Sequence, residues 1–92
     1  MERKKNLPTV CPSCQAQLHV ASLHCPGCLT CIDGDYLLPA FLLLPADDQR
    51  FIFDFVLCSG SLKEMAARMA LSYPTVRNRL DDIINRLKSF ES

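Results

Sequence analysis

The sequence lacks a net charge, a long apolar run and the motifs of a catalytic site. Its 92 residues include ten basic and ten acidic side chains, whereas an extended nucleic-acid interface carries an excess of positive charge. The longest apolar run, YLLPAFLLLPA, is about half the length that crosses a bilayer and contains two prolines, so we expect no transmembrane helix. The basic N-terminus has no apolar segment like that of a signal peptide, and we expect a cytoplasmic protein.

The missing catalytic motifs argue against an enzyme. The chain has no glycine-rich phosphate loop and no cysteine–histidine–acid spacing, and nothing in it indicates a small-molecule substrate. It is also short. A chain of this length buries only about two-thirds of its unfolded surface, so a metal ion, a dimer interface or both would help it to fold.

The charges that are present are unevenly distributed. Residues 1–32 sum to +2, residues 33–58 to −4 and residues 59–92 to +2. The two basic ends allow a local contact with a polyanion, although the acidic middle weakens such a contact in a monomer.

Four of the six cysteines form two C-x-x-C hooks, CPSC and CPGC, with ten residues between them. Paired hooks suit tetrahedral zinc, because each tight turn presents two thiolates to one ion. Disulfides are the alternative, but a reducing cytosol disfavours them, and a thioredoxin-like site would need one C-x-x-C in a βαβ unit. We predict one structural zinc ion, with no open position for catalysis, held by Cys11, Cys14, Cys25 and Cys28.

The segment between the hooks alternates apolar and polar residues, which predicts a small β-hairpin. Cys31 extends the second hook and is an alternative ligand to Cys28, although a bystander thiol is the simpler interpretation. His24 is an alternative ligand to Cys25, but we interpret both His24 and His19 as strand-surface residues.

The middle of the chain predicts a helix from about Pro45 to Cys58, ended by Gly60. Pro45 suits the first turn, and Asp47 and Asp48 favour the positive end of the helix dipole. Cys58 is expected to be a small buried side chain. The apolar residues of this helix cover more of its circumference than one small bundle buries, which predicts a homodimer. They are Phe51, Ile52, Phe53, Phe55, Val56 and Leu57.

Two further helices follow, joined by a short turn at Ala70 and Leu71. Ser61 and Glu64 form a capping box at the start of the first, and Ser72 caps the second. Apolar residues at helical spacing predict the inner face of each helix. These are Met65, Ala66 and Met69 in the first, and Val76, Leu80, Ile83, Leu87 and Phe90 in the second.

The pattern M-A-x-x-M-A-L-S-x-x-T-V-x-x-x-L resembles the helix-turn-helix of response regulators and of sigma-factor region four. The whole chain, with CPSC, CPGC and then SYPTVRNRL, is similar to an uncharacterised bacterial family that joins an N-terminal zinc ribbon to a C-terminal helix-turn-helix. The resemblance covers nearly all of the chain. It implies a mainly α fold with a small β zinc ribbon at residues 1–38, a three-helix helix-turn-helix domain at residues 39–92, and a DNA-binding transcription regulator.

The sequence departs from these motifs at glycine positions. Ribbon hooks usually have glycine directly after the second cysteine, where this chain has Gln15 and Leu29. Helix-turn-helix turns commonly have glycine where it has Ala70. Because that position tends to adopt positive φ, alanine there costs about 1 kcal/mol.

In a helix-turn-helix the second helix lies in the major groove. We predict that Arg77 and Asn78 contact base edges, because arginine makes two hydrogen bonds to guanine and asparagine makes two to adenine. The side chains predicted to contact phosphates are Tyr73, Thr75, Arg79, Lys63 and Arg68. Asp81 and Asp82 oppose such contacts, since carboxylates near phosphates are repelled.

A second class of function stays open at this point. Zinc ribbons often dock on proteins, and helices similar to sigma region four also bind RNA polymerase or a sigma factor. The zero net charge and the acidic, apolar helix favour such an adaptor. Loss of binding as salt rises would favour DNA instead, and a homodimer on DNA would need half-sites about one helical turn apart.

Overall fold

The computed structural model describes residues 7–91 and divides the chain into two compact units, residues 1–43 and residues 44–92. This division falls a few residues after the boundary at 38/39 that the sequence predicts. The short 3-10 helix η1 (Ala40–Leu43) ends the first unit. No helix within residues 7–91 has both the length and the apolar character needed to cross a membrane.

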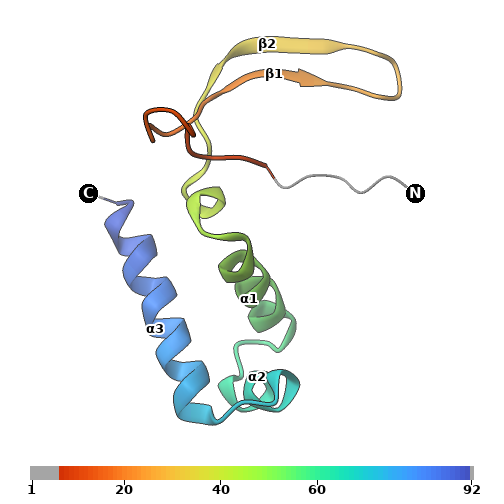
Figure 1. Cartoon of the computed structure of the whole chain (residues 1–92). Helices are drawn as coiled ribbons and strands as arrows, with labels where there is room; N and C mark the ends of the chain where they lie inside the picture. The colour runs from red at the N-terminus through yellow and green to blue at the C-terminus, as the bar shows by residue number, and fades with distance from the viewer. Residues whose placement is uncertain (1–6, 92) are drawn as a thin grey trace. The chain divides into compact units, whose positions relative to one another are not determined.

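The first unit is a β-hairpin with a hook on either side of its first strand (Figure 1). Strands β1 (Val20–His24) and β2 (Cys31–Tyr36) pair antiparallel, and an isolated bridge joins Val10 to Gln17 around the first hook. Within residues 7–43 only Leu38 is buried, with 7% of its surface exposed. The described part of this unit therefore has almost no core of its own.

The second unit consists of helices α1 (Ala46–Leu57), α2 (Leu62–Met69) and α3 (Tyr73–Ser89), as Figure 1 shows. All three helices contribute to one buried apolar cluster, comprising Leu44, Phe51, Cys58, Met65, Ala66, Val76 and Ile83. Leu80, Leu87, Phe90 and Met69 pack against it while partly exposed. The predicted inner stripes, the buried thiol of Cys58 and the mainly α fold class with a small β ribbon are confirmed.

The helix boundaries follow from capping residues. The Ser61 hydroxyl accepts a hydrogen bond from the Glu64 N–H at 3.1 Å, and the Ser72 hydroxyl accepts one from the Thr75 N–H at 3.3 Å. Each serine satisfies a donor that the first helical turn leaves unpaired. The caps that the sequence predicts for α2 and α3 are thus present.

Helix α1 keeps part of its apolar surface in solvent. Phe53, Val56 and Leu57 expose 55%, 68% and 59% of their surface, whereas Phe51 is buried and stacks on Phe55 with ring centroids 6.2 Å apart. The surplus of apolar residues expected for this helix therefore lies on its outer side. The homodimer inferred from that surplus stays a prediction.

Candidate metal hooks and nucleic-acid interface

The two cysteine hooks have the same backbone structure. In the first, the Gln15 N–H donates to the Cys11 carbonyl and the Cys11 N–H donates to the Ala16 carbonyl, both at 2.8 Å. In the second, Leu29 donates to Cys25 and Cys25 donates to Thr30, again at 2.8 Å. Two separate segments of the chain thus adopt the same type of turn, as expected of paired metal hooks.

Each hook closes through a residue with positive φ. Gln15 and Leu29, at the positions where ribbon hooks usually have glycine, both have φ of 65°. A side chain at such a φ is strained, so both hooks adopt the expected turn without the residue that fits it best.

One thiol in each hook accepts hydrogen bonds that favour its ionised form. Backbone N–H groups of Cys14 and Ser13 lower the pKa of Cys11, and the Ser13 N–H lies 3.4 Å from the Cys11 sulfur. The Thr30 hydroxyl, 2.9 Å from the Cys28 sulfur, lowers the pKa of that thiol. Zinc binds thiolates, so each hook presents the donor chemistry that a zinc ion requires.

The positions of the hooks within the hairpin matter for the zinc prediction. The second hook connects β1 to β2, and the first hook lies at the other end of the hairpin (Figure 1). Within residues 7–91 no three cysteine, histidine or carboxylate side chains converge as a metal site. The structure therefore shows two preformed half-sites, and the predicted set of four ligands requires the hooks to approach each other.

The remaining polar residues of the hairpin lie on its surface. His19 Nδ1 is 2.7 Å from the Asp35 carboxylate, and both side chains are substantially exposed. His24 is the cross-strand neighbour of Cys31, and the Cys31 sulfur is 3.9 Å from the Leu29 carbonyl oxygen.

The second unit has the local geometry of a helix-turn-helix. Helix α2 ends at Ala70, which adopts the left-handed conformation with φ 55° and ψ 41°. The Leu71 N–H then donates to the Ala66 carbonyl at 3.0 Å, and α3 begins after Ser72 with Pro74 in its first turn. Positive φ at Ala70 is the conformation that the sequence predicts for this position.

The first two turns of α3 present a polar outer face. Val76 is fully buried, whereas Tyr73 is 52% exposed and the side chain of Arg77 is 54% exposed. Asn78 is also exposed. Both residues predicted to contact bases therefore face solvent.

The side chains predicted to contact phosphates are in different environments. Lys63 is exposed on α2 and has no ion-pair partner among residues 7–91. Arg68 is exposed, and its guanidinium lies 3.5 Å from the buried Cys58 sulfur. The Thr75 hydroxyl is 2.8 Å from that of Ser72 and so takes part in the helix cap.

Arg79, the last of these candidates, faces α1. Its guanidinium is 3.3 Å from carboxylate oxygens of both Asp47 and Asp48 and lies over the Phe51 ring, 5.6 Å from its centroid. The basic residues of the N-terminus that contribute to the predicted charge of +2 lie outside the described residues.

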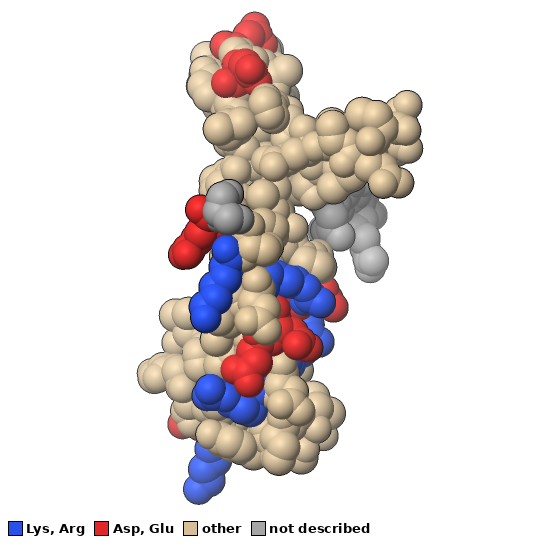
Figure 2. All heavy atoms as spheres, turned by 90° about the vertical axis from the view of Figure 1, so that its left-hand side faces the viewer, with Lys and Arg blue, Asp and Glu red and all other residues tan. Residues whose placement is uncertain are grey.

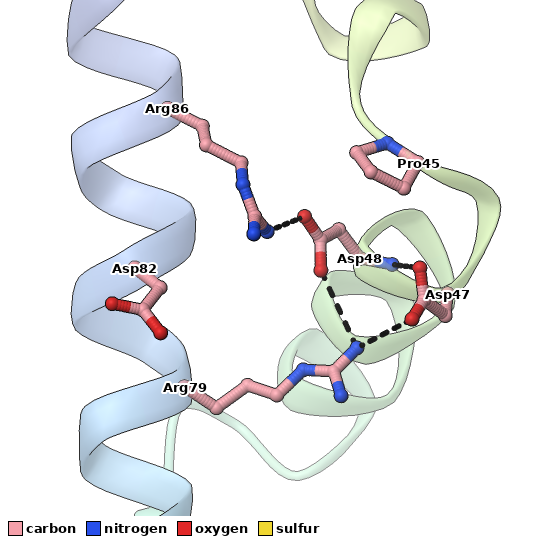
Figure 3. Close-up of a pocket in the computed structure, with 6 residues that line it drawn as sticks. All are labelled: Pro45, Asp47, Asp48, Arg79, Asp82 and Arg86. Atoms are coloured by element: carbon pink, nitrogen blue, oxygen red, sulfur yellow. Dashed lines mark hydrogen bonds and ion pairs between the residues drawn. The ribbon is translucent and has the colours of Figure 1, made fainter.

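Asp48 is a buried acidic residue that joins α1 to α3, whereas the sequence predicts for it only an interaction with the helix dipole. Asp48 is only 2% exposed and pairs with both Arg79 and Arg86. Figure 3 shows the three side chains converging in a cavity of 360 Å³ that Asp47, Asp82 and Pro45 also line. The periodicity of α1 contained the signal, since Asp48 has the same helical phase as Phe51 and Phe55.

The charged surface of the second unit is mixed in sign. On the face that Figure 2 shows, Lys and Arg side chains are interspersed with Asp and Glu side chains and form no continuous basic stripe. Arg77 illustrates this arrangement, because its Nε is 3.5 Å from the Asp81 carboxylate one turn later in α3. Any contact with a polyanion on this face therefore depends on a few individual cations.

Comparison with known families reproduces the division of the chain. Residues 11–42 match the DUF2089 zinc ribbon, and residues 44–90 match a domain of unknown function described as the DUF2089 helix-turn-helix. No curated protein and no solved structure matches the chain. The two matches confirm the resemblance that the sequence motifs indicate. The chain belongs to the DUF2089 family, in which a zinc ribbon is followed by a helix-turn-helix domain.

Proposed function

We propose that this protein is a DNA-binding transcription regulator in which α3 enters the major groove and the zinc ribbon has a structural role. The exposed N-terminal face of α3 is the observation that carries this proposal. Arg77 and Asn78 lie there in solvent, held by a capped helix whose opposite side is anchored through the fully buried Val76. A helix presented in this way by a preceding helix and turn is the recognition element of helix-turn-helix proteins.

The contacts follow from the environments of the side chains. Arg77 and Asn78 contact bases, because they are exposed near the start of α3 and carry groups that match guanine and adenine. Tyr73 and Lys63 contact phosphates, joined by Thr75 and by Arg68 at the end of α2. Arg79 has a different role, since its contacts to Asp47 and Asp48 hold α3 against α1.

One zinc ion held by Cys11, Cys14, Cys25 and Cys28 completes the ribbon. The matching turns of the two hooks and the matched ribbon family support this assignment. Bound zinc would supply the fixed attachment between the hooks that the unit otherwise lacks, so the hooks approach each other as the metal binds. Four thiolates leave no open coordination position, which agrees with a role in binding rather than in catalysis.

The first experiment is selection from a randomised duplex library with the zinc-loaded full chain, followed by binding measurements at two salt concentrations. We expect an enriched motif whose binding weakens as salt rises, because each phosphate contact releases counterions. Absence of any enriched motif, with zinc bound and the helices intact, would contradict the proposal. The symmetry of the enriched motif would test the predicted homodimer, which requires two half-sites.

A matched pair of variants separates base contacts from phosphate contacts. Arg77→Ala should reduce the preference for the selected motif, at a loss of about 1–3 kcal/mol on the correct base pair. Lys63→Ala should weaken binding to all duplexes similarly and lower the slope of the salt dependence by about one. If neither substitution changes binding, α3 is not the recognition helix.

The second candidate function is an adaptor that binds RNA polymerase, a sigma factor or another protein. An apolar groove on the first unit favours it, with a volume of 540 Å³ and a lining that includes Leu7, Leu18, Val20, Leu23, Leu37 and Leu42. A cavity of this size and character accommodates an apolar side chain of a partner. Recovery of a specific protein partner after nuclease treatment, without an enriched duplex, would favour the adaptor.

A further inference from the structure

The pairing of Arg77 with Asp81 deepens the proposed function and rests on it. Asp81 lies one helical turn after Arg77, and its carboxylate oxygen is 3.5 Å from Arg77 Nε. Both side chains are about half exposed, at 54% and 48%. This ion pair involves Nε alone, and within residues 7–91 the terminal nitrogens of Arg77 have no ion-pair partner, so their N–H donors remain available for a base.

We infer that Asp81 is a specificity-determining residue that positions Arg77 for a base contact. A guanidinium recognises guanine through two parallel hydrogen bonds, so its orientation decides how well the correct base is distinguished. Arginine has many rotamers, and a carboxylate at i+4 restricts them. The pair is weak in water but strengthens when the groove excludes solvent, because the local dielectric constant falls.

The same carboxylate opposes binding in general. Asp81 places a negative charge near the start of the recognition helix, where it is repelled by phosphates of any sequence. Asp81 therefore lowers affinity for every duplex and raises the discrimination among duplexes. Loss of Asp81 should therefore raise the affinity for any duplex while it lowers the discrimination among duplexes. These opposite signs distinguish a positioning role from a role in folding.

The chain contains a matched control in Asp82. This residue has the same charge and the next position in α3, but it lines the cavity beside Asp48 and Arg86 (Figure 3). It forms no ion pair within the part of the chain that the structure describes. Removal of Asp82 therefore changes the charge of α3 without releasing Arg77.

The test compares the zinc-loaded full chain with its Asp81→Ala, Asp82→Ala, Asp81→Glu and Arg77→Ala variants. Binding to the selected duplex and to a scrambled duplex is measured at matched salt concentrations. We expect Asp81→Ala to bind the scrambled duplex about threefold more tightly and to lose about fivefold in the ratio of specific to scrambled binding. Asp82→Ala should raise both affinities and keep the ratio, and Asp81→Glu, which retains a carboxylate, should preserve most of it.

The possible failures can be told apart. If the wild type has no preferred duplex, or if Arg77→Ala keeps the preference, the proposed base contact is wrong and the role of Asp81 fails with it. If Arg77→Ala loses the preference but Asp81→Ala behaves like Asp82→Ala, the base contact stands and the positioning role is overturned. Equal helical signals and melting temperatures of the variants exclude unfolding as the cause.

Discussion

Among the residues that the structure describes, the first unit buries one side chain, Leu38, whereas the second buries seven apolar side chains and one carboxylate. The second unit therefore has the core that a small helical domain needs, and the first has two preformed turns and a hairpin. Apolar burial contributes roughly 25 cal/mol per Å², so a unit with so little of it depends on another source of stability. Side-chain packing therefore stabilises the second unit, and the proposed zinc ion would supply the stability that the first unit lacks.

Removal of the metal should reveal the difference in stability between the two units most clearly. The double substitution Cys11→Ser and Cys14→Ser should abolish zinc binding and unfold residues 7–43, because binding to a structural site contributes about 10 kcal/mol to folding. The second unit should keep its helices. Metal analysis and the dispersion of backbone amide resonances would measure both effects.

Cys31→Ser is the matched control for this change, since Cys31 lies beside the second hook but outside the proposed ligand set. It should retain one zinc ion per chain. The assignment would be wrong if Cys31→Ser lost the metal, or if the double variant kept dispersed resonances for β1 and β2 without zinc.

Loss of the buried carboxylate should destabilise only the second unit. Asp48→Ala leaves Arg79 and Arg86 without their shared partner and opens space beside Phe51. Because both arginines are partly exposed, we expect a loss of about 2–3 kcal/mol in the free energy of unfolding, below the range for fully buried pairs. Urea unfolding followed by helical circular dichroism would measure it.

Asp82→Ala is the control for this prediction, because it removes a carboxylate from the same cavity without breaking an ion pair. Its effect should stay within about 0.5 kcal/mol. Equal losses for the two variants would show that the contacts of Asp48 do not hold α3 to α1.

The left-handed turn between α2 and α3 offers a change of opposite sign. Ala70→Gly should raise the free energy of unfolding of the second unit by about 0.5–1 kcal/mol, since glycine adopts positive φ without strain. Ala67→Gly, at an exposed position inside α2, should lower it by about 1 kcal/mol. A loss of stability in both variants, measured by urea unfolding, would mean that Ala70 does not have positive φ in solution.

The corresponding positions in the hooks should show the smallest effect. Gln15→Gly and Leu29→Gly should each raise zinc affinity about two- to fivefold, because they remove the strain of positive φ from the metal-bound state. Competition with a chelator would measure the affinity. Ser13→Gly changes the same hook at a residue that does not have positive φ, and an equal gain there would show that the effect is unrelated to φ.

The parts of this structure that follow local rules could be predicted from the sequence. The caps at Ser61 and Ser72, the positive φ at Ala70 and the inner stripe through Val76 and Ile83 all depend on residues within a few positions of one another. The turn of each hook is similarly local, because the backbone hydrogen bonds that close it join residues four or five positions apart.

The parts that depend on how helices face each other could not be predicted. Arg79 was expected at a phosphate because its position in α3 alone does not reveal that α1 brings Asp48 and Phe51 beside it. Asp81 was expected to oppose DNA binding, and its pairing with Arg77 is the exception here, because the i,i+4 spacing within α3 is a local signal that the sequence contained. The separation of the two hooks at opposite ends of the hairpin (Figure 1) depends on the path of the chain between them, which hook spacing does not determine.

The sequence by itself determined the two-part organisation, the capped helices and the hooks, because these depend on residue order and short-range sterics. Only the tertiary structure decided which charges are used internally. Asp48 is buried between two arginines because the packing of α1 against α3 leaves its carboxylate no solvent, and an ionised group without water requires partners of opposite charge. That packing turns the partly exposed Arg79 toward α1 and leaves Arg77 and Asn78 in solvent.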